Sequence, residues 1–404
     1  MPLNPFRTLV VHRNFRLFWF GQTLSLIGTW MQTMAQGWLA LQLSNSALLV
    51  GLVAAASSLP ILLFSFHAGV VVDRVDKLRT VRICQALLAM QAGTLWWFTA
   101  SGHITIGWLV ALAATNGLIS SLEIPARQSL VIDLVGRQDL PGAIALNSSG
   151  FNLARVVGPG IGAVIIARAG LSACFGVNSL SYVAVLIGLF MIRLPRQLPP
   201  TTRFSPSEGI REGLVFMTKT RTVFSLMSVV TVFSVLGIPY LTLMPVVARD
   251  TLHLDAGGYG LLLACVGTGG LLGALGLAAV GDRFSRGRIL SVASITFPVL
   301  LIVFALVRNP VLACIVLLGI GFSMIVNNAL CNAMLQHLVP DHLRGRMMAA
   351  YSFVVVGVSQ VLGSLVAGGI ARAFGVSVAI GGGALVMLVY GYVAFFRHSE
   401  LRAL

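Results

Sequence analysis

Residues 69–81 read GVVVDRVDKLRTV, and they end an apolar run that begins near residue 48 with no polar spacer between the two. The charged residues of this stretch could belong to a catalytic site, a nucleic-acid patch or the end of a membrane span. A second copy, AAVGDRFSRGRIL, occupies residues 278–290 and also ends an apolar run. A cluster that recurs in this way favours two matched membrane-boundary elements over a single catalytic site.

The composition points to the membrane as well. Of 404 residues, 57% are hydrophobic and only 10% are charged, whereas soluble domains carry about a quarter charged residues. The net charge is +15, but the basic residues form short clusters between apolar runs. Nucleic-acid binding needs a dense basic face with aromatic side chains, so the charge indicates loops facing an anionic membrane surface and no nucleic-acid partner.

Signals for enzymes, metals and processing are absent from the sequence. The five cysteines are odd in number and show no C-x-x-C spacing, so they are expected to be packing residues, with no metal site and no disulfide. No H-E-x-x-H, G-x-S-x-G or Walker A motif occurs, which argues against an enzyme and against bound cofactors. GTGGLLGALG at 267–276 is interpreted as small-residue helix packing within a span. The N-terminus lacks a cleavage site, and the first span is expected to be retained.

Apolar runs long enough to cross a bilayer recur along the chain, because a spanning helix needs about 20 apolar residues. Twelve spans are predicted. They cover residues 15–41, 47–72, 80–100, 105–134, 141–167, 171–193, 223–248, 256–281, 288–307, 310–337, 345–372 and 375–396.

The distribution of basic residues predicts the orientation. If both termini are cytoplasmic, the loops and nearby helix ends on the opposite side hold Arg168, Arg249, Arg308 and Arg372, and nearly all other basic residues lie inside. A multi-pass protein of the bacterial plasma (inner) membrane is expected.

The chain repeats at half its length. Placing Asp73 over Asp282 brings Arg79 over Arg288, and QSLVIDLVG at 128–136 matches NAMLQHLVP farther along. Such a repeat suits two parallel six-helix bundles. The expected domains are an N-terminal bundle at 1–194, a cytoplasmic linker with a short amphipathic helix at 195–222, and a C-terminal bundle at 223–404.

The charged stretch also carries a family resemblance. GVVVDRVDKLR resembles the signature loop between the second and third helices of the major facilitator superfamily, written G-x-L-A-D-R-x-G-R-K/R. Asp76 stands where that pattern has Gly, and it either weakens the turn or pairs with Arg79. PARQSLVIDLV at 125–135 and LNSSGFNLARVVGPGIGAVI at 146–165 are similar to the branch of the enterobactin exporter and of macrolide and drug efflux proteins. The resemblance implies an all-α polytopic membrane protein with twelve transmembrane helices in two pseudo-symmetric bundles.

The resemblance further implies a cytoplasmic gate. Gly69 lies one turn before Asp73, so both share a face of the second span, and glycine permits close helix approach. The aspartate can then reach the positive N-terminus of a neighbouring helix, which the family implies to be the eleventh span near Arg346. The alternative is a generic run of charges at the water boundary. The candidate gate residues are Gly69, Asp73, Arg74, Lys77, Arg79, Arg127, Asp282 and Arg283.

Glu123 is the one carboxylate that the sequence places well inside a span. Ionisable groups in a membrane are costly, so each is a functional candidate. Arg155 lies inside the next, antiparallel span. A carboxylate facing an arginine stays ionised until a proton or a charged substrate competes for it, so the pair is a candidate for proton coupling. The alternatives are a permanent structural pair, two residues that do not meet, and Arg127 as the partner of Glu123.

Neutral polar residues inside the spans outline a candidate substrate cavity, although each can equally be an interhelical hydrogen-bond partner. The family implies that the first, fourth, seventh and tenth spans surround this cavity. Asn327 is the repeat counterpart of Glu123. The candidates are Gln22, Gln32, Gln36, Asn116, Tyr240, Asn327, Asn328 and Asn332.

GPGIG at 158–162 resembles the antiporter signature G-x-x-x-G-P-x-x-G-G, with two of its glycines replaced by alanine. Pro159 removes a backbone donor and bends the helix, while Gly158 and Gly162 let another helix pack closely. In the family this element accompanies export. The resemblance therefore implies an efflux transporter with an antiporter mechanism.

The sequence thus predicts a monomeric secondary transporter that exports an amphipathic small molecule, such as a siderophore, macrolide or other drug, with the proton gradient as its energy source. The alternatives are a lipid or metabolite transporter or an uncoupled facilitator of the same fold, and a membrane sensor or scaffold that does not transport.

Overall fold

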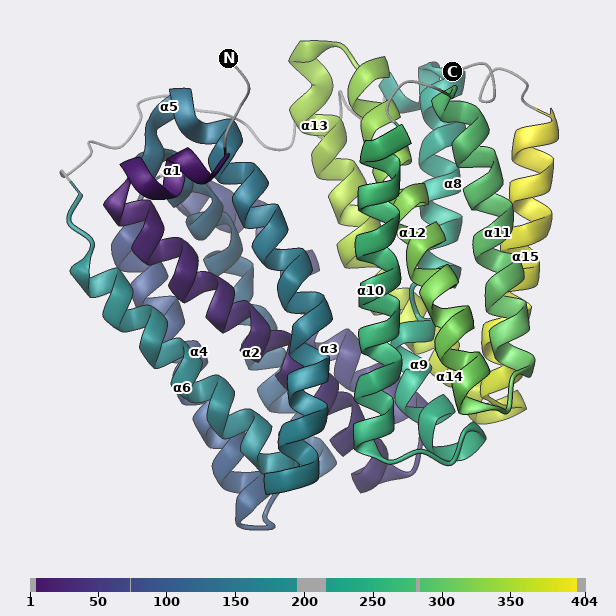
Figure 1. The fold of residues 1–404 in the computed structure, drawn as a ribbon, viewed down its shortest axis with the longest axis horizontal. Helices are drawn as coiled ribbons and strands as arrows, with labels where there is room; N and C mark the ends of the chain where they lie inside the picture. Colours follow the sequence, from purple (N-terminus) through teal and green to yellow (C-terminus); the bar gives the residue numbers. More distant parts are fainter. Residues whose placement is uncertain (1–4, 73, 195–215, 281–283, 398–404) are drawn as a thin grey trace. The chain divides into compact units, whose positions relative to one another are not determined.

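The computed structural model describes residues 5–72, 74–194, 216–280 and 284–397. Within these ranges the chain is built of helices and short connections, with no β-strand (Figure 1). This confirms the all-α fold class. In a membrane, helices satisfy every backbone hydrogen bond internally, which is why an apolar chain of this composition adopts them.

Nine helical segments of the described ranges are long and apolar enough to cross a membrane. One of them, α5 (Ile106–Ala169), consists of two helical arms that cover the predicted fourth and fifth spans and meet at a kink at Gly136, where φ is 73°. Helices α2 (Arg13–Ser44) and α4 (Lys77–Ala100) cover the predicted first and third spans but are more polar and are not among the nine. The count of twelve therefore stays a prediction.

The chain forms two compact units. Unit 1 contains residues 1–44 and 59–202, and unit 2 contains residues 45–58 and 203–404. Helix α3 (Ala47–Val72) contributes to both, because its first half packs with unit 2. Most of the predicted linker, residues 195–215, lies outside the described residues, whereas residues 216–219 are helical.

Unit 1 is an antiparallel bundle in which α2 packs on α5 and α6, and α4 packs on the same two helices. The short helix α1 lies across the ends of the long helices (Figure 1). A core of large apolar side chains, including Phe15, Phe18, Leu130 and Leu189, is fully buried between them. The remaining helices of the unit are α1 (Pro5–Val11) and α6 (Leu171–Met191).

Glycines bring α5 against α2. A Cβ at Gly158 would lie 2.8 Å from the backbone oxygen of Ile27, and one at Gly162 would lie 2.9 Å from Met31 Cγ. Both distances are shorter than real Cβ contacts. The GPGIG segment therefore packs at a separation that larger side chains would prevent, with Pro159 buried in the same surface.

The end of α6 is held by an arginine of α4. Arg82 donates from Nη2 to the carbonyl oxygens of Leu189, at 2.7 Å, and Ile192, at 3.2 Å. Its guanidinium also lies 5.0 Å from the ring centroid of Phe190. The last carbonyls of a helix lack partners from a following turn; Leu189 O accepts from the backbone N–H of Ile192 at 3.3 Å, and Arg82 adds side-chain donors to it and to Ile192 O.

Unit 2 repeats the pattern of long helices with two interruptions. The predicted seventh span is divided into α8 (Arg221–Gly237), α9 (Tyr240–Val246) and the π-helical η1 (Val247–Thr251). The predicted eleventh is divided into α13 (Asp341–Ser352), the π-helical η2 (Phe353–Gly363) and α14 (Ser364–Phe374). The remaining helices are α10 (Ala256–Val280), α11 (Arg286–Leu306), α12 (Pro310–Leu338) and α15 (Val376–Arg397).

Helices α10 and α12 pack through glycines. A Cβ at Gly273 would lie 2.6 Å from the backbone oxygen of Phe322, and a Cβ at Gly269 or Gly321 would meet backbone atoms of the facing helix even more closely. The segment GTGGLLGALG lies within α10, so its interpretation as helix packing is confirmed.

The first half of α3 packs on α14, also in unit 2. A Cβ at Gly368 would lie 2.9 Å from the backbone oxygen of Ala47, and Gly51 faces the backbone of Ser364 with no room for a side chain. Arg249 donates to the side-chain oxygen of Asn45, just before α3 begins.

Candidate transport site

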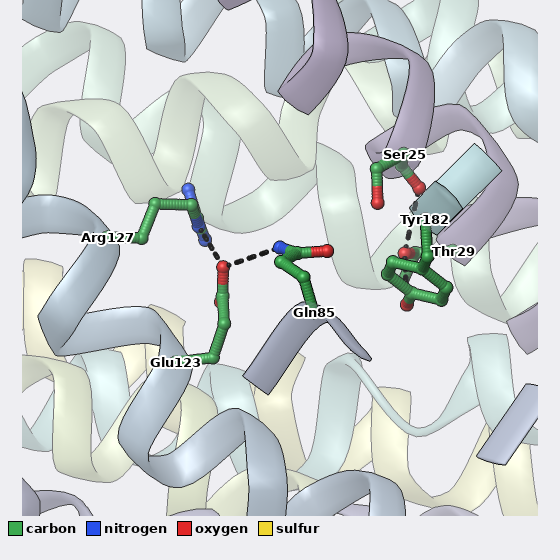
Figure 2. Close-up of polar contacts among 6 residues, drawn as sticks. All are labelled: Ser25, Thr29, Gln85, Glu123, Arg127 and Tyr182. Carbon is green, nitrogen blue, oxygen red and sulfur yellow. Dashed lines mark hydrogen bonds and ion pairs between the residues drawn. The ribbon is translucent and has the colours of Figure 1, made fainter. Parts of the chain in front are cut away.

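Glu123 lies inside unit 1, on the first arm of α5, and only 5% of its surface is exposed. Two side chains donate to the same carboxylate oxygen, Oε1. Arg127 Nε lies 2.9 Å away and Gln85 Nε2, from α4, lies 3.1 Å away. Figure 2 shows Glu123 between these two partners. The carboxylate is therefore held by a cation of its own helix and by a neutral amide of the neighbouring one.

Arg127, one of the partners considered from the sequence, forms an ion pair with Glu123 in the structure. They lie four residues apart, which places them on one helix face, and both side chains are largely buried. Arg155 is half-buried on the second arm of α5, and its pairing with Glu123 stays a prediction. An ion pair in a dry interior stabilises little by itself, but removing one partner leaves a costly unpaired charge.

A hydroxyl cluster lies beside this centre. Tyr182 of α6 and Thr29 of α2 join their hydroxyl groups at 3.1 Å, and Thr29 donates to the backbone oxygen of Ser25 at 2.9 Å (Figure 2). Tyr182 is close enough to Glu123 and Arg127 to interact with their charges. Polar groups of α2, α4, α5 and α6 thus converge on one level of the bundle.

Amide side chains form a second buried network in unit 1. Asn178 Nδ2 donates to Gln32 Oε1 at 2.8 Å, and Gln32 Nε2 faces Gln91 Oε1 at 3.4 Å. Gln91 donates onward to the backbone oxygen of Leu112. Because each amide is buried with partners in the bundle, the network holds helices together, and for Gln32 the hydrogen-bond interpretation is favoured over substrate contact.

Unit 2 carries a neutral version of the Glu123 centre. Asn327 Nδ2 donates to Ser294 Oγ at 2.7 Å, and Cys331 Sγ lies 3.8 Å from Asn327 Oδ1. The sequence repeat places Asn327 over Glu123 and Cys331 over Arg127, while the register of Arg79 over Arg288 places Ser294 over Gln85. All three contacting positions of one unit therefore recur in the other, without the charges.

The other candidate cavity residues differ in environment. Gln22 is buried and Gln36 and Asn116 are half-buried. Tyr240 is buried, 4.0 Å from Met324 Sδ. Asn328 and Asn332 are half-buried on α12, where Asn328 accepts from the Tyr351 hydroxyl through its backbone oxygen and Asn332 accepts from Gln336.

The candidate gate is described in part. Asp73, Asp282 and Arg283 lie outside the described residues, and the gate stays a prediction. Beyond its own stretch of helix, no atom of the described residues lies within 4 Å of a Cβ built at Gly69. Arg74 and Arg79 are exposed.

The charged loop nevertheless shows two defined contacts. Asp76 is the N-cap of α4 and accepts from the backbone N–H of Arg79 at 2.9 Å, so it pairs locally through the backbone. Lys77 forms an ion pair with Asp133 of α5 at 2.8 Å. The residue that departs from the signature pattern thus begins a helix, since an aspartate at this position satisfies an N–H that the helix leaves unpaired.

Gln85, Asn178 and Tyr182 were not selected from the sequence. They lie in the predicted third and sixth spans, whereas the cavity candidates were taken from the spans that the family places around the cavity. The sequence does hold a signal for Gln85: it is a polar residue inside an apolar run, and the internal repeat aligns it with another polar residue, Ser294. Within the described ranges no group of three or more His, Cys, Asp or Glu side chains could hold a metal ion.

Comparison with known proteins identifies the family. Residues 1–403 match the transmembrane secretion effector family of the major facilitator superfamily. The chain is 29% identical to the multidrug efflux pump Tap of Mycolicibacterium fortuitum over 91% of this chain and 92% of that protein. It is 27% identical to the staphyloferrin A transporter of Staphylococcus aureus over 89% of this chain and 90% of that protein. It is 22% identical to macrolide efflux protein A of Streptococcus pyogenes over 67% of this chain and 68% of that protein.

Solved structures share the fold. A bacterial homologue of the human lysosomal transporter Spinster, in an inward-facing and unoccupied conformation, matches with a TM-score of 0.75 at 14% identity over 97% of both chains. The peptide transporter POT in complex with sulfate matches with a TM-score of 0.77 at 11% identity over 97% of this chain and 95% of that one. The expected fold is confirmed, and the chain belongs to the transmembrane secretion effector family of major facilitator transporters, a multi-pass membrane protein and not an enzyme.

Proposed function

We propose that the protein exports an amphipathic small molecule in exchange for protons, with Glu123 as the proton site. The observation that carries this proposal is a carboxylate buried inside unit 1 and paired with Arg127. A buried ionisable group in a membrane bundle is costly, and protonation is the simplest event that changes its pairing.

The exchange of partners supplies the coupling step. When Glu123 takes up a proton, Arg127 loses its counter-charge and becomes available to an anionic group of a substrate or to another side chain. When the proton leaves, the ion pair re-forms. A proton can drive a conformational cycle only if its affinity differs between the conformations. A centre whose charge changes by one unit on protonation supplies such a difference in affinity between the states of an alternating-access cycle.

Export and the substrate class are supported by the relatives. Two of those named above are efflux proteins, for multiple drugs and for macrolides, and a third is a siderophore transporter. We infer that a drug, macrolide or siderophore is moved outward across the plasma membrane of a bacterium, with both termini cytoplasmic and a monomer as the working unit. The second candidate is an uncoupled facilitator, or a lipid or metabolite transporter, of the same fold.

Proteoliposomes with an imposed pH gradient test the proposal. Uptake of ethidium, erythromycin and an iron-free carboxylate siderophore is measured for the wild type, for Glu123→Gln and for Asp250→Asn, a partly exposed carboxylate beside Arg249. The gradient is expected to drive uptake in the wild type and in Asp250→Asn, and Glu123→Gln is expected to lose the dependence. Uptake that ignores the gradient would contradict coupling, and an unaltered Glu123→Gln would exclude that residue.

A further inference from the structure

The amide of Gln85 is satisfied at one end only. Gln85 is 1% exposed, its Nε2 donates to Glu123 Oε1, and its Oε1 is buried without a hydrogen-bond partner among the described residues. Figure 2 shows this oxygen directed away from the Glu123 carboxylate. A buried acceptor without a partner costs about 1–3 kcal/mol. The observed orientation is therefore selected by something that outweighs this loss.

The charge of Glu123 explains the orientation. An ionised carboxylate offers only acceptors, so it attracts the N–H end of an amide and repels the carbonyl end. A protonated carboxyl group carries an O–H donor and needs an acceptor. The two ends of an amide are almost equal in size, so a half-turn of the side chain exchanges them with little repacking.

Within the described ranges, the other side chain that hydrogen-bonds to Glu123 does not provide that acceptor. Arg127 has only donors. Tyr182 of α6 and Cys84 of α4 lie within electrostatic range, and the Tyr182 hydroxyl already pairs with Thr29.

The charged residues of the neighbouring helices α2 and α4 lie near the N-terminal ends of those helices. On α2 they lie in the first turn, on α4 in the first two turns, and α6 carries none between Leu171 and Met191. His67 is exposed on the half of α3 that belongs to unit 1, and Arg155 lies on the other arm of α5. The residues in question are Arg13, Arg16, Lys77, Arg79, Arg82, His67 and Arg155.

We propose that Gln85 is a positioning residue whose amide turns over when Glu123 is protonated, presenting Nε2–H to the carboxylate and Oε1 to the acid. The proton comes from solvent and remains on a carboxyl oxygen of Glu123, and Gln85 exchanges none. This inference rests on the proposed proton site. By satisfying both charge states, Gln85 makes each of them tolerable in a buried place and couples the state of α5 to α4.

Infrared difference spectroscopy tests the inference in the full-length protein without substrate or gradient. Spectra at acidic and alkaline pH are compared for protein carrying glutamine labelled with carbon-13 at the side-chain carbonyl. In the wild type, acidification should produce a carboxylic acid band from Glu123 and a shift of one labelled amide band to lower frequency, because its carbonyl gains a hydrogen bond.

Variants assign the signal. Glu123→Gln should lose both bands. Gln85→Met should lose the amide shift while the acid band moves to the higher frequency of a less hydrogen-bonded acid. Gln91→Met, a buried glutamine of α4 that contacts Gln32 and Leu112, should keep both. If Gln85→Met fails to fold, Gln85→Asn, whose amide is one methylene shorter, replaces it with the same expected loss.

The outcomes separate this inference from the proposed function. An acid band without an amide shift, or an amide shift that survives in Gln85→Met, overturns the role of Gln85 even if transport is proton-coupled. The absence of any Glu123 acid band also overturns it. If both bands appear as described but transport ignores the pH gradient, the positioning role stands and the proposed function fails.

Discussion

Asn327 donates its Nδ2–H to Ser294 Oγ over 2.7 Å at the positions of unit 2 that correspond to Glu123 and Gln85 of unit 1. The same interhelical contact has thus been kept in both halves of the repeat, as an amide and a hydroxyl in one and as a carboxylate and an amide in the other. Such a contact stabilises helix packing in either form, whereas only the charged form responds to protons.

Ser294→Ala should separate these two roles. Because it removes one partner of a buried hydrogen bond, it should lower stability by about 1–2 kcal/mol, read as a lower thermal midpoint in detergent. The pH dependence of transport should be unchanged, since the neutral centre does not titrate. A pH profile that shifts in Ser294→Ala would show that the second centre takes part in coupling.

Arg127→Met should destabilise the protein more strongly. It leaves the Glu123 carboxylate in the bundle without its cation, and breaking a buried pair costs about 3–5 kcal/mol. The double variant Arg127→Met with Glu123→Gln should recover most of that loss, because no unpaired charge remains. The thermal midpoints of wild type, both single variants and the double variant complete the cycle, and additive losses would contradict the pair.

Gly158→Ala should weaken the contact between α5 and α2. The added Cβ would lie 2.8 Å from the Ile27 backbone oxygen and from Trp30 Cβ, and overpacking of this kind costs about 1–3 kcal/mol. Gly160→Ala is the matched control, since no described atom beyond its own stretch of helix lies within 4 Å of its Cβ. It should be neutral or slightly stabilising in thermal melts. Equal effects of the two changes would argue against close packing at Gly158.

Asp76→Ala should cost about 1 kcal/mol through loss of the N-cap of α4. Asp76→Gly restores the residue of the family pattern. It should lower stability by only a few tenths of a kcal/mol, because glycine is a tolerated cap. Asp76→Asn keeps the acceptor and is the control. Thermal melts of the three variants should therefore rank Ala below Gly and Asn, and a different order would contradict the capping role.

Much of the helical layout could be predicted from the sequence because long apolar runs bounded by charges leave few alternatives in a membrane. The predicted eighth span at 256–281 and tenth at 310–337 coincide with α10 and α12 to within one residue. The repeat also predicted the correspondence of Asn327 with Glu123. What it did not predict was the kink at Gly136 at which the two helical arms of α5 meet.

The polar centre could be predicted only in part. Burial cost identified Glu123, since a carboxylate inside an apolar run stands out in any sequence. Its partner depends on side-chain direction and helix rotation, and these decide between Arg127 and a residue of another span. Gln85 was missed for the same reason: a neutral amide is not conspicuous in a sequence, and its importance comes from the atom beside which the fold places it.

The three hydrogen bonds from Arg82 to the carbonyl oxygens of Leu189 and Ile192 tie two helices of unit 1 together. They join the last turn of α6 and the residue that follows it to the first two turns of α4. Held in this way, the last turn of α6 should fray less than a helix end without side-chain donors, and it is fixed to α4, the helix that also carries Gln85. A change that displaces the end of α6 should therefore also shift α4, the helix whose Gln85 contacts Glu123.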